Sequence, residues 1–220
     1  VDMVEASESF DLSNTLVGGG NTIENLTYTG SIAATLTGNS LNNSLFGNSG
    51  NDTLEGRGGV DTLSGGSGED VYIVDTTTDL IEDAGGATDM VRSSVSFNLS
   101  NTLVGGGGEI EYLVYTGSSA ATLTGNSLDN SIVGGAGADT LEGQDGTDSL
   151  VGGDGNDVYI VDSTADTIQD ASGTDTVRSS VDFDLSDPNV SGGIGVEHLG
   201  PSVGVIARRV AAGASLTRAT

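Results

Sequence analysis

Residues 38–73 read GNSLNNSLF, GNSGNDTLE, GRGGVDTLS and GGSGEDVYI when they are divided into nines. Each nine begins with glycine, has Asn or Asp at its sixth position, and has a large, mostly apolar residue at its eighth. The same pattern returns at residues 125–160 as GNSLDNSIV, GGAGADTLE, GQDGTDSLV and GGDGNDVYI. These two blocks are the best guide to the fold of the chain.

A nine-residue period matches neither a heptad nor the 3.6-residue period of an amphipathic helix. Most of each nine is rich in Gly, Asn and Asp, which form turns, and the last residues form a short strand. Only the eighth side chain points to a core, so one repeat cannot fold alone. Stacked repeats bury these side chains together, and the pattern therefore predicts an all-β solenoid.

The sixth-position carboxylates then acquire a role, because stacking brings those of neighbouring turns together. Like charges at short range repel unless a cation lies between them, and carboxylate and carbonyl oxygens are hard ligands that suit Ca2+. The alternative is a set of metal-free surface turns, which does not explain the regular eighth position. The candidate ligands are Asp52, Asp61, Asp70, Asp139, Asp148 and Asp157.

Residues 65–73 match every fixed position of the pattern G-G-x-G-x-D-x-U-x, and so do residues 152–160. The two blocks thereby resemble the RTX (hemolysin-type) calcium-binding nonapeptide repeats. The resemblance implies a right-handed parallel β-roll that binds several Ca2+ ions, with successive turns on opposite edges. It also implicates the fourth-position glycines, which are Gly50, Gly59, Gly68, Gly137, Gly146 and Gly155.

In such a roll each Ca2+ is shared between one turn and the next but one. Asp79 and Asp166 stand at the sixth position of a degenerate fifth turn, where they either complete a last site or form a solvated acidic edge. Asn43 and Asn130 depart from the pattern, which predicts a weak first site in each block. The implied pairs are Asp52–Asp70, Asp61–Asp79, Asp139–Asp157 and Asp148–Asp166.

A longer period surrounds the blocks. FDLSNTLVG at residues 10–18 returns about 87 residues later as FNLSNTLVG, and FDLS opens again at residue 183. Val1 aligns with mid-module Thr88, so we expect a segment of a longer polypeptide. The predicted divisions are module 1 at 1–87 (block 38–79), module 2 at 88–174 (block 125–166), a partial third module at 175–199, and a divergent, Arg-containing tail at 200–220.

The amino-acid composition excludes several classes of function. The 220 residues include 36 Gly and no Cys, and the formal charge is −26. Such an acidic chain is not expected to bind nucleic acid, and it has no run of 18 apolar residues to span a membrane. We expect a chain that is expanded without calcium and compact with it. Since extracellular calcium sites are weak, this favours a secreted, extracellular or cell-surface protein.

Catalytic motifs have little support. Residues 200–204 read GPSVG and match the hydrolase pattern G-x-S-x-G, but the only histidine, His198, precedes Ser202 and no acid follows. Paired aspartates serve some glycosidases, but here the turn pattern already explains each of them. We therefore expect a chain that is not an enzyme.

The sequence thus predicts a calcium-binding repeat segment of a bacterial surface or extracellular structural protein, such as an adhesin, a surface layer or a self-assembling fibre. Calcium, end-to-end copies of the chain and a cell-surface component are the expected partners. The alternative is an RTX region that aids export and folding of a larger secreted enzyme or toxin. A mineral- or ice-binding face is disfavoured, because Thr53, Thr62 and Thr140 recur too sparsely.

Overall fold

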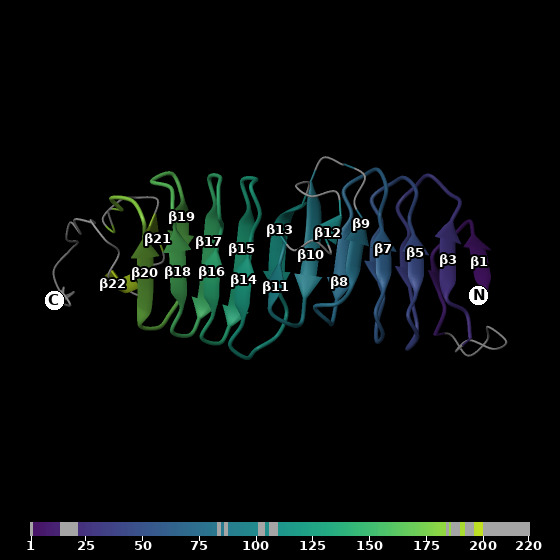
Figure 1. Ribbon diagram of the computed structural model, residues 1–220, viewed down its shortest axis with the longest axis horizontal. Coiled ribbons are helices and arrows are strands. Elements are labelled where there is room, and N and C mark those ends of the chain that lie inside the picture. Colours follow the sequence, from purple (N-terminus) through teal and green to yellow (C-terminus); the bar gives the residue numbers. More distant parts are fainter. Residues whose placement is uncertain are drawn as a thin grey trace. The chain divides into compact units, whose positions relative to one another are not determined.

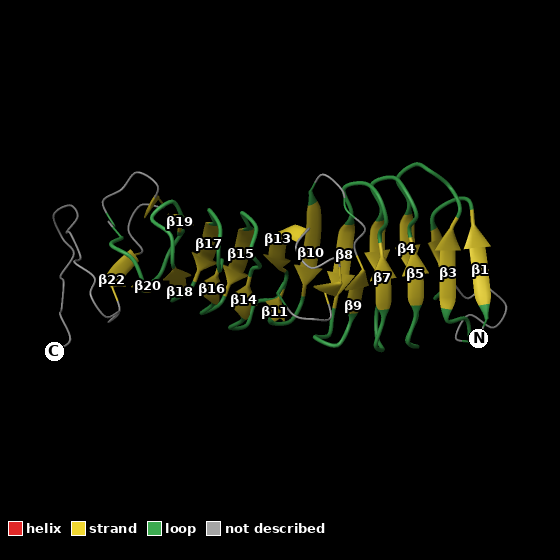
Figure 2. Cartoon of the chain, turned by 45° about the horizontal axis from the view of Figure 1, so that its top comes forward, coloured by secondary structure: helices red, strands yellow, loops and turns green. Residues whose placement is uncertain are grey.

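The fold is described from a computed structural model of the chain (Figure 1). The described residues contain strands and turns and no helix, as Figure 2 shows by colour. Accordingly, no helix among them is long and apolar enough to cross a membrane. The predicted tail at 200–220, which includes Ser202, lies outside the described residues. These are residues 2–13, 22–82, 85, 88–100, 104–105, 110–183, 185, 190–191 and 196–199.

The chain divides into two compact units, which are described separately. The first comprises Val1–Val95 and Ser100–Tyr112, and the second comprises Ser96–Leu99 and Leu113–Thr220. Each unit contains one nonapeptide block. The module boundaries at residues 87 and 174 stay predictions from the sequence repeat.

In the first unit, consecutive strands of the block alternate between two parallel sheets. One sheet has the order β1 (Met3–Ala6), β3 (Asn25–Tyr28), β5 (Ser44–Phe46), β7 (Thr62–Ser64), β9 (Leu80–Glu82) and β12 (Val104–Gly105). The other has the order β2 (Phe10–Asp11), β4 (Thr35–Thr37), β6 (Thr53–Glu55), β8 (Val71–Val74) and β10 (Asp89–Ser93). Two nonapeptides, with one strand in each sheet, therefore make one coil.

The second unit repeats this arrangement. One parallel sheet has the order β11 (Phe97–Asn98), β14 (Thr122–Thr124), β16 (Thr140–Glu142), β18 (Val158–Val161), β20 (Asp175–Ser179) and β22 (Val196–Leu199). The other has β15 (Ser131–Ala136), β17 (Ser149–Asp154), β19 (Thr167–Gln169) and β21 (Val190–Ser191), together with the end of β13 (Ile110–Tyr115). His198 lies on β22, whose backbone pairs with β20.

The core of each unit is built around the eighth-position side chains of its block, which stack in two rows with residues from the flanking strands. Paired residues in neighbouring coils continue each row, as Leu54 does with Tyr72. None of these side chains has measurable exposure, and burial of each contributes about 1.5–3 kcal/mol. The rows are Leu36–Leu54–Tyr72–Val91 and Leu26–Leu45–Leu63–Ile81 in the first unit, and Leu123–Leu141–Tyr159–Val177 and Ile132–Leu150–Ile168 in the second.

The prediction of an all-β parallel solenoid is therefore confirmed. Successive turns of each block lie on opposite edges, because the strands that follow them belong to different sheets. Residues 18 apart in the sequence occupy the same place in neighbouring coils, as the register of β4 with β6 shows. This register sets where the sixth-position carboxylates meet.

Candidate metal centres

The fourth-position glycines shape each turn. All six predicted glycines have φ between 108° and 139°, a left-handed conformation that other residues rarely adopt. A Cβ added to Gly68 would also collide with the carbonyl oxygen of Gly50 in the preceding coil. The turns therefore stack backbone against backbone, and only glycine permits this approach.

The first-position glycines leave a small cradle that is lined by oxygen atoms. A methyl carbon added to Gly47 would lie 2.5 Å from Asp52 Oδ2 and 2.6 Å from the carbonyl oxygen of Gly65. These two oxygens come from the same edge of neighbouring coils. Glycine at this position therefore lets two oxygens of neighbouring coils come close together, and hard oxygens of this kind are the ligands that Ca2+ prefers.

The same cradle occurs in the second unit. A methyl carbon on Gly134 would lie 2.8 Å from Asp139 Oδ2 and 2.9 Å from the carbonyl oxygen of Gly152. Glycine at the first position therefore keeps a space open between a carboxylate of one turn and a carbonyl of the next coil.

The sixth-position carboxylates form hydrogen-bonded ladders along the edges of each unit. The Asp52 N–H donates to Asp70 Oδ1 at 2.7 Å, and the Asp139 N–H donates to Asp157 Oδ1 at 2.8 Å. The structure therefore brings together the residues of each pair that the RTX resemblance implies. The same bond, at 2.7–3.1 Å, links Asn43 to Asp61, Asp61 to Asp79, Asn130 to Asp148 and Asp148 to Asp166.

The second oxygen of most of these carboxylates has no hydrogen-bond partner among the described residues. The side chains are at most 1% exposed, so water does not compensate. A buried, ionised carboxylate with an unsatisfied oxygen is costly unless a cation approaches it. The atoms concerned include Oδ2 of Asp52, Asp61, Asp139, Asp148 and Asp157.

Burial also shifts the protonation of these groups. It raises the pKa of Asp61 and of Asp148 to about 7, against the lowering effect of the backbone hydrogen bond, and the aspartate in the next coil raises it further. Burial likewise raises the pKa of Asp52 and of Asp157 to about 6. Without a cation these carboxyl groups hold protons unusually tightly, because nothing else neutralises their charge.

Asp79 and Asp166 are both 2% exposed, so the alternative of a solvated acidic edge is wrong for them. Asp166 already uses both oxygens: Oδ1 accepts from the Asp148 N–H and Oδ2 accepts from the Ser163 N–H at 3.2 Å. Their assignment as metal ligands stays a prediction.

Asn43 differs from the aspartates because its whole side chain is satisfied within the protein. Its Oδ1 accepts from the Asn39 N–H at 2.7 Å, and its Nδ2 donates to the carbonyls of Ile23 and Glu24 at 3.2 and 3.3 Å. An amide donor thus stands where other turns present a carboxylate oxygen. We retain the prediction that the first site of each block is weak.

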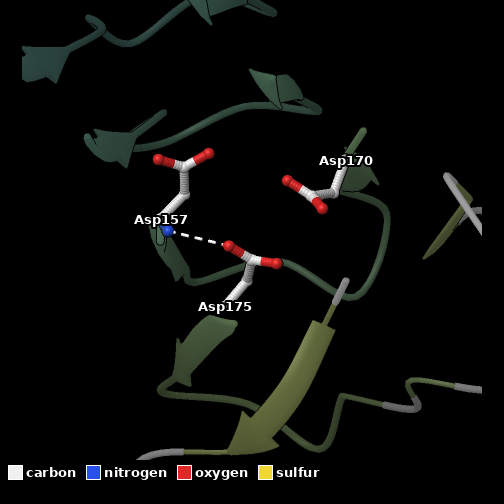
Figure 3. Close-up of side chains that lie close together, drawn as sticks. All are labelled: Asp157, Asp170 and Asp175. Carbon is white, nitrogen blue, oxygen red and sulfur yellow. Dashed lines mark hydrogen bonds between the residues drawn. The ribbon is translucent and has the colours of Figure 1, made fainter. Parts of the chain in front are cut away.

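The sequence interpretation missed three buried aspartates beyond the blocks. The Asp70 N–H donates to Asp89 Oδ1, and the Asp157 N–H donates to Asp175 Oδ1 (Figure 3), so both ladders continue. Asp170 lies beside Asp157 and Asp175 in a cluster of three acids. A signal was present, since residues 170–178 read DASGTDTVR, with Gly and Asp at the fourth and sixth positions.

Comparison with protein families agrees with this geometry. The RTX calcium-binding nonapeptide repeat, a family description that covers four copies, matches residues 37–72 and 124–159. Both blocks are therefore RTX repeats, which imply calcium binding at several sites, and the parallel solenoid is consistent with an RTX β-roll. A search of curated proteins found no match. Repeats of this kind form a structural module and are not catalytic by themselves.

Proposed function

We propose that this chain is a calcium-folded, non-enzymatic structural segment of a secreted bacterial protein of the cell surface or extracellular space. An adhesin, a surface layer or a self-assembling fibre is the kind of protein in which we propose that it serves. The observation that supports this most strongly is the ladder of buried carboxylates, most of which have one oxygen bonded to the backbone and a second without a hydrogen-bond partner among the described residues. A fold whose interior carries uncompensated negative charge needs cations to be stable.

Different groups of the turn have different roles in binding the ion. The first-position glycine keeps the cradle open, the sixth-position carboxylate supplies an oxygen from one coil, and a backbone carbonyl supplies another from the next. Bound Ca2+ supplies the positive charge that the chain lacks at these positions. Because each carboxylate is also bonded to the preceding coil, neutralising it stabilises the contact between coils.

This linkage suits a protein that must fold outside the cell. Extracellular calcium modules bind with a Kd of about 10⁻⁴–10⁻³ M, so their sites fill only where calcium is abundant. RTX proteins are typically secreted, and a chain with a charge of −26 remains expanded until calcium neutralises part of it.

Self-association is the proposed structural use of the folded solenoid. The strands at the end of a stack of coils carry unpaired backbone groups, which pair with a further coil of the same chain or of another copy. A calcium-folded solenoid thereby becomes a unit that adds end to end.

The test is circular dichroism combined with light scattering on the full chain, in excess chelator and in a calcium series. We expect a gain of β signal and a smaller hydrodynamic radius with calcium, followed by association that depends on protein concentration. A radius that is the same in chelator and in calcium contradicts calcium-dependent folding. A calcium-folded chain that stays monomeric at all concentrations contradicts self-association and favours an export and folding region of a larger secreted enzyme or toxin.

A further inference from the structure

Three carboxylates from separate segments meet at the end of the second block. Asp157 precedes β18, Asp170 follows β19 and Asp175 begins β20. One oxygen of each lies within 4.8 Å of the others, and the side chains are 1%, 3% and 0% exposed. In Figure 3 the carboxylate of Asp170 points toward the other two.

In each of these side chains one carboxylate oxygen accepts a hydrogen bond, and the other has no partner among the described residues. Oδ1 of Asp157 accepts from the Asp139 N–H, and Oδ1 of Asp175 accepts from the Asp157 N–H, both at 2.8 Å. Oδ1 of Asp170 accepts from the Tyr159 hydroxyl, also at 2.8 Å. The remaining oxygen, Oδ2, of all three is buried and has no hydrogen-bond partner in the described part of the chain.

Asp170 makes this cluster different from the turns of the block. It stands at the first position of the degenerate nine at residues 170–178, where every complete nonapeptide has glycine. Gly173, at the fourth position, keeps the left-handed φ of 147° that its counterparts share. The turn geometry thus continues for another coil, but a carboxylate replaces the glycine that leaves the cradle open elsewhere.

The chemistry of the cluster calls for a hard divalent cation. Three buried carboxylates repel one another strongly in a medium of low dielectric constant, and each has a free oxygen available for coordination. With Ca2+–oxygen distances of about 2.3–2.6 Å, two ligand oxygens of one ion are at most about 5 Å apart. One oxygen of each carboxylate lies within 4.8 Å of the others, so the three come close to what one ion requires.

We propose that Asp157, Asp170 and Asp175 form a Ca2+ site of their own, distinct from the two-carboxylate sites of the nonapeptide turns. The third carboxylate adds a unit of ligand charge, so this site binds Ca2+ more tightly than the turn sites do. It closes the ladder that runs through Asp139 and Asp157, and it lies partly outside the segment that the RTX family matches. The inference rests on the proposed function, since it adds a site to a calcium-folded solenoid.

The test is a calcium titration of the full chain by calorimetry, with the variant Asp170→Asn and the control Asp154→Asn. Asn keeps the size and the acceptor for Tyr159 but removes the charge. Asp154 is an exposed aspartate of the same block, bonded to the Ser172 hydroxyl. We expect Asp170→Asn to lose the tightest ion or to weaken it at least about ten-fold, and Asp154→Asn to bind as the parent does.

The outcomes distinguish failure of the three-carboxylate site from failure of the proposed function. Unchanged number and affinity of bound ions in Asp170→Asn overturns the three-carboxylate site, and is expected if Asp170 and Asp175 share a proton instead. The turn sites and the proposed function stand in that case. A parent chain that binds no calcium refutes both.

A second variant and readout cover the possibility that Asp170→Asn does not fold. Tyr159→Phe keeps the buried ring but removes the hydroxyl that holds Asp170, so the tightest site should weaken several-fold while the other sites stay unchanged. Tb3+ bound at the cluster lies next to the Tyr159 phenol, and its luminescence excited through tyrosine should fall in this variant. Equal affinity and equal luminescence in Tyr159→Phe and the parent contradict the proposal.

Discussion

Asn43 and Asp61 occupy the same position on one edge of the solenoid, in neighbouring coils. Their side chains differ in how fully they are hydrogen-bonded. Asn43 satisfies both its oxygen and its amide nitrogen within the protein, whereas Asp61 leaves Oδ2 buried without a hydrogen bond to any described residue. The turn can therefore form with either residue. What distinguishes them is the buried, unsatisfied oxygen of the carboxylate, from which we infer that calcium dependence belongs to the sixth position.

The largest effect should come from filling the cradle of an aspartate turn. In Gly56→Ala the new Cβ would meet Asp61 Oδ2 and lie 2.6 Å from its Cγ. We expect a loss of about 1–3 kcal/mol in the free energy of unfolding, measured in calcium, and loss of the ion at that turn.

Gly58→Ala, in the same turn, is the matched control. A Cβ there has nothing within 4 Å, and the residue is not among those with positive φ. This variant should be neutral, or more stable by about 0.4–1 kcal/mol because the unfolded chain loses freedom. A cost in Gly58→Ala equal to that in Gly56→Ala would show that any added methyl group disturbs the turn.

Exchanging Asn and Asp between positions 43 and 61 should transfer the calcium dependence from one turn to the other. Asp61→Asn removes a ligand charge, and we expect about ten-fold weaker calcium binding at that site together with a more stable fold in chelator. Asn43→Asp loses the two Nδ2 bonds and should be less stable in chelator but bind calcium more tightly at the first site. Calorimetry and denaturant unfolding, each with and without calcium, measure both quantities.

If both exchanges destabilise the fold equally in calcium and in chelator, the sixth position is only structural.

Protons should partly replace calcium at the aspartate turns. Burial raises the pKa of Asp61 and Asp148 from 3.8 to about 7 in the folded chain, so the fold binds protons more tightly than the unfolded chain does. Their contribution to stability is complete below about pH 4 and is lost as pH rises through about 7. In chelator, acidification from about pH 7.5 to about pH 5 should increase the β signal.

The double variant Asp61→Asn, Asp148→Asn should flatten this pH dependence, because amides do not titrate. A metal-free fold that is equally stable across this range would contradict the assigned pKa values.

The smallest effect concerns the backbone of an aspartate turn. Gln144, at the second position of its nonapeptide, has a φ of 69°, whereas Gly153 holds the same position of the next nonapeptide at a φ of 104°. Gln144→Gly should relieve backbone strain and stabilise the chain by about 1 kcal/mol in calcium, as measured by thermal unfolding. A lower midpoint would mean that contacts of the Gln144 side chain outweigh the strain.

The sequence predicted the core and the ladders because both depend on strict periodicity. With one large residue and one acid in every nine, Leu54 and Asp52 have only one place in a stack of coils. The prediction failed where the period degenerates. Asp170 replaces a glycine, and only Gly173, Asp175 and Val177 remain of the pattern, so that turn was not recognised.

Two further features depend on neighbours that the nonapeptide does not specify. The amide bonds of Asn43 reach Ile23 and Glu24, which precede the block and do not follow its spacing. The burial of Asp79 and Asp166, each 2% exposed, is likewise not specified by the nine-residue pattern. Local periodicity therefore identifies which residues face inward, but the environment at each end of a block depends on irregular segments.

The most direct test is to locate the ions, by anomalous diffraction from crystals of the full chain grown in calcium. We predict an ion between neighbouring coils at the Asp52–Asp70 and Asp139–Asp157 pairs, with Asp52 Oδ2 and Asp139 Oδ2 at about 2.3–2.6 Å from it. Calcium-saturated crystals in which those oxygens stay buried and uncoordinated, with ions only on the outer surface, would contradict the account.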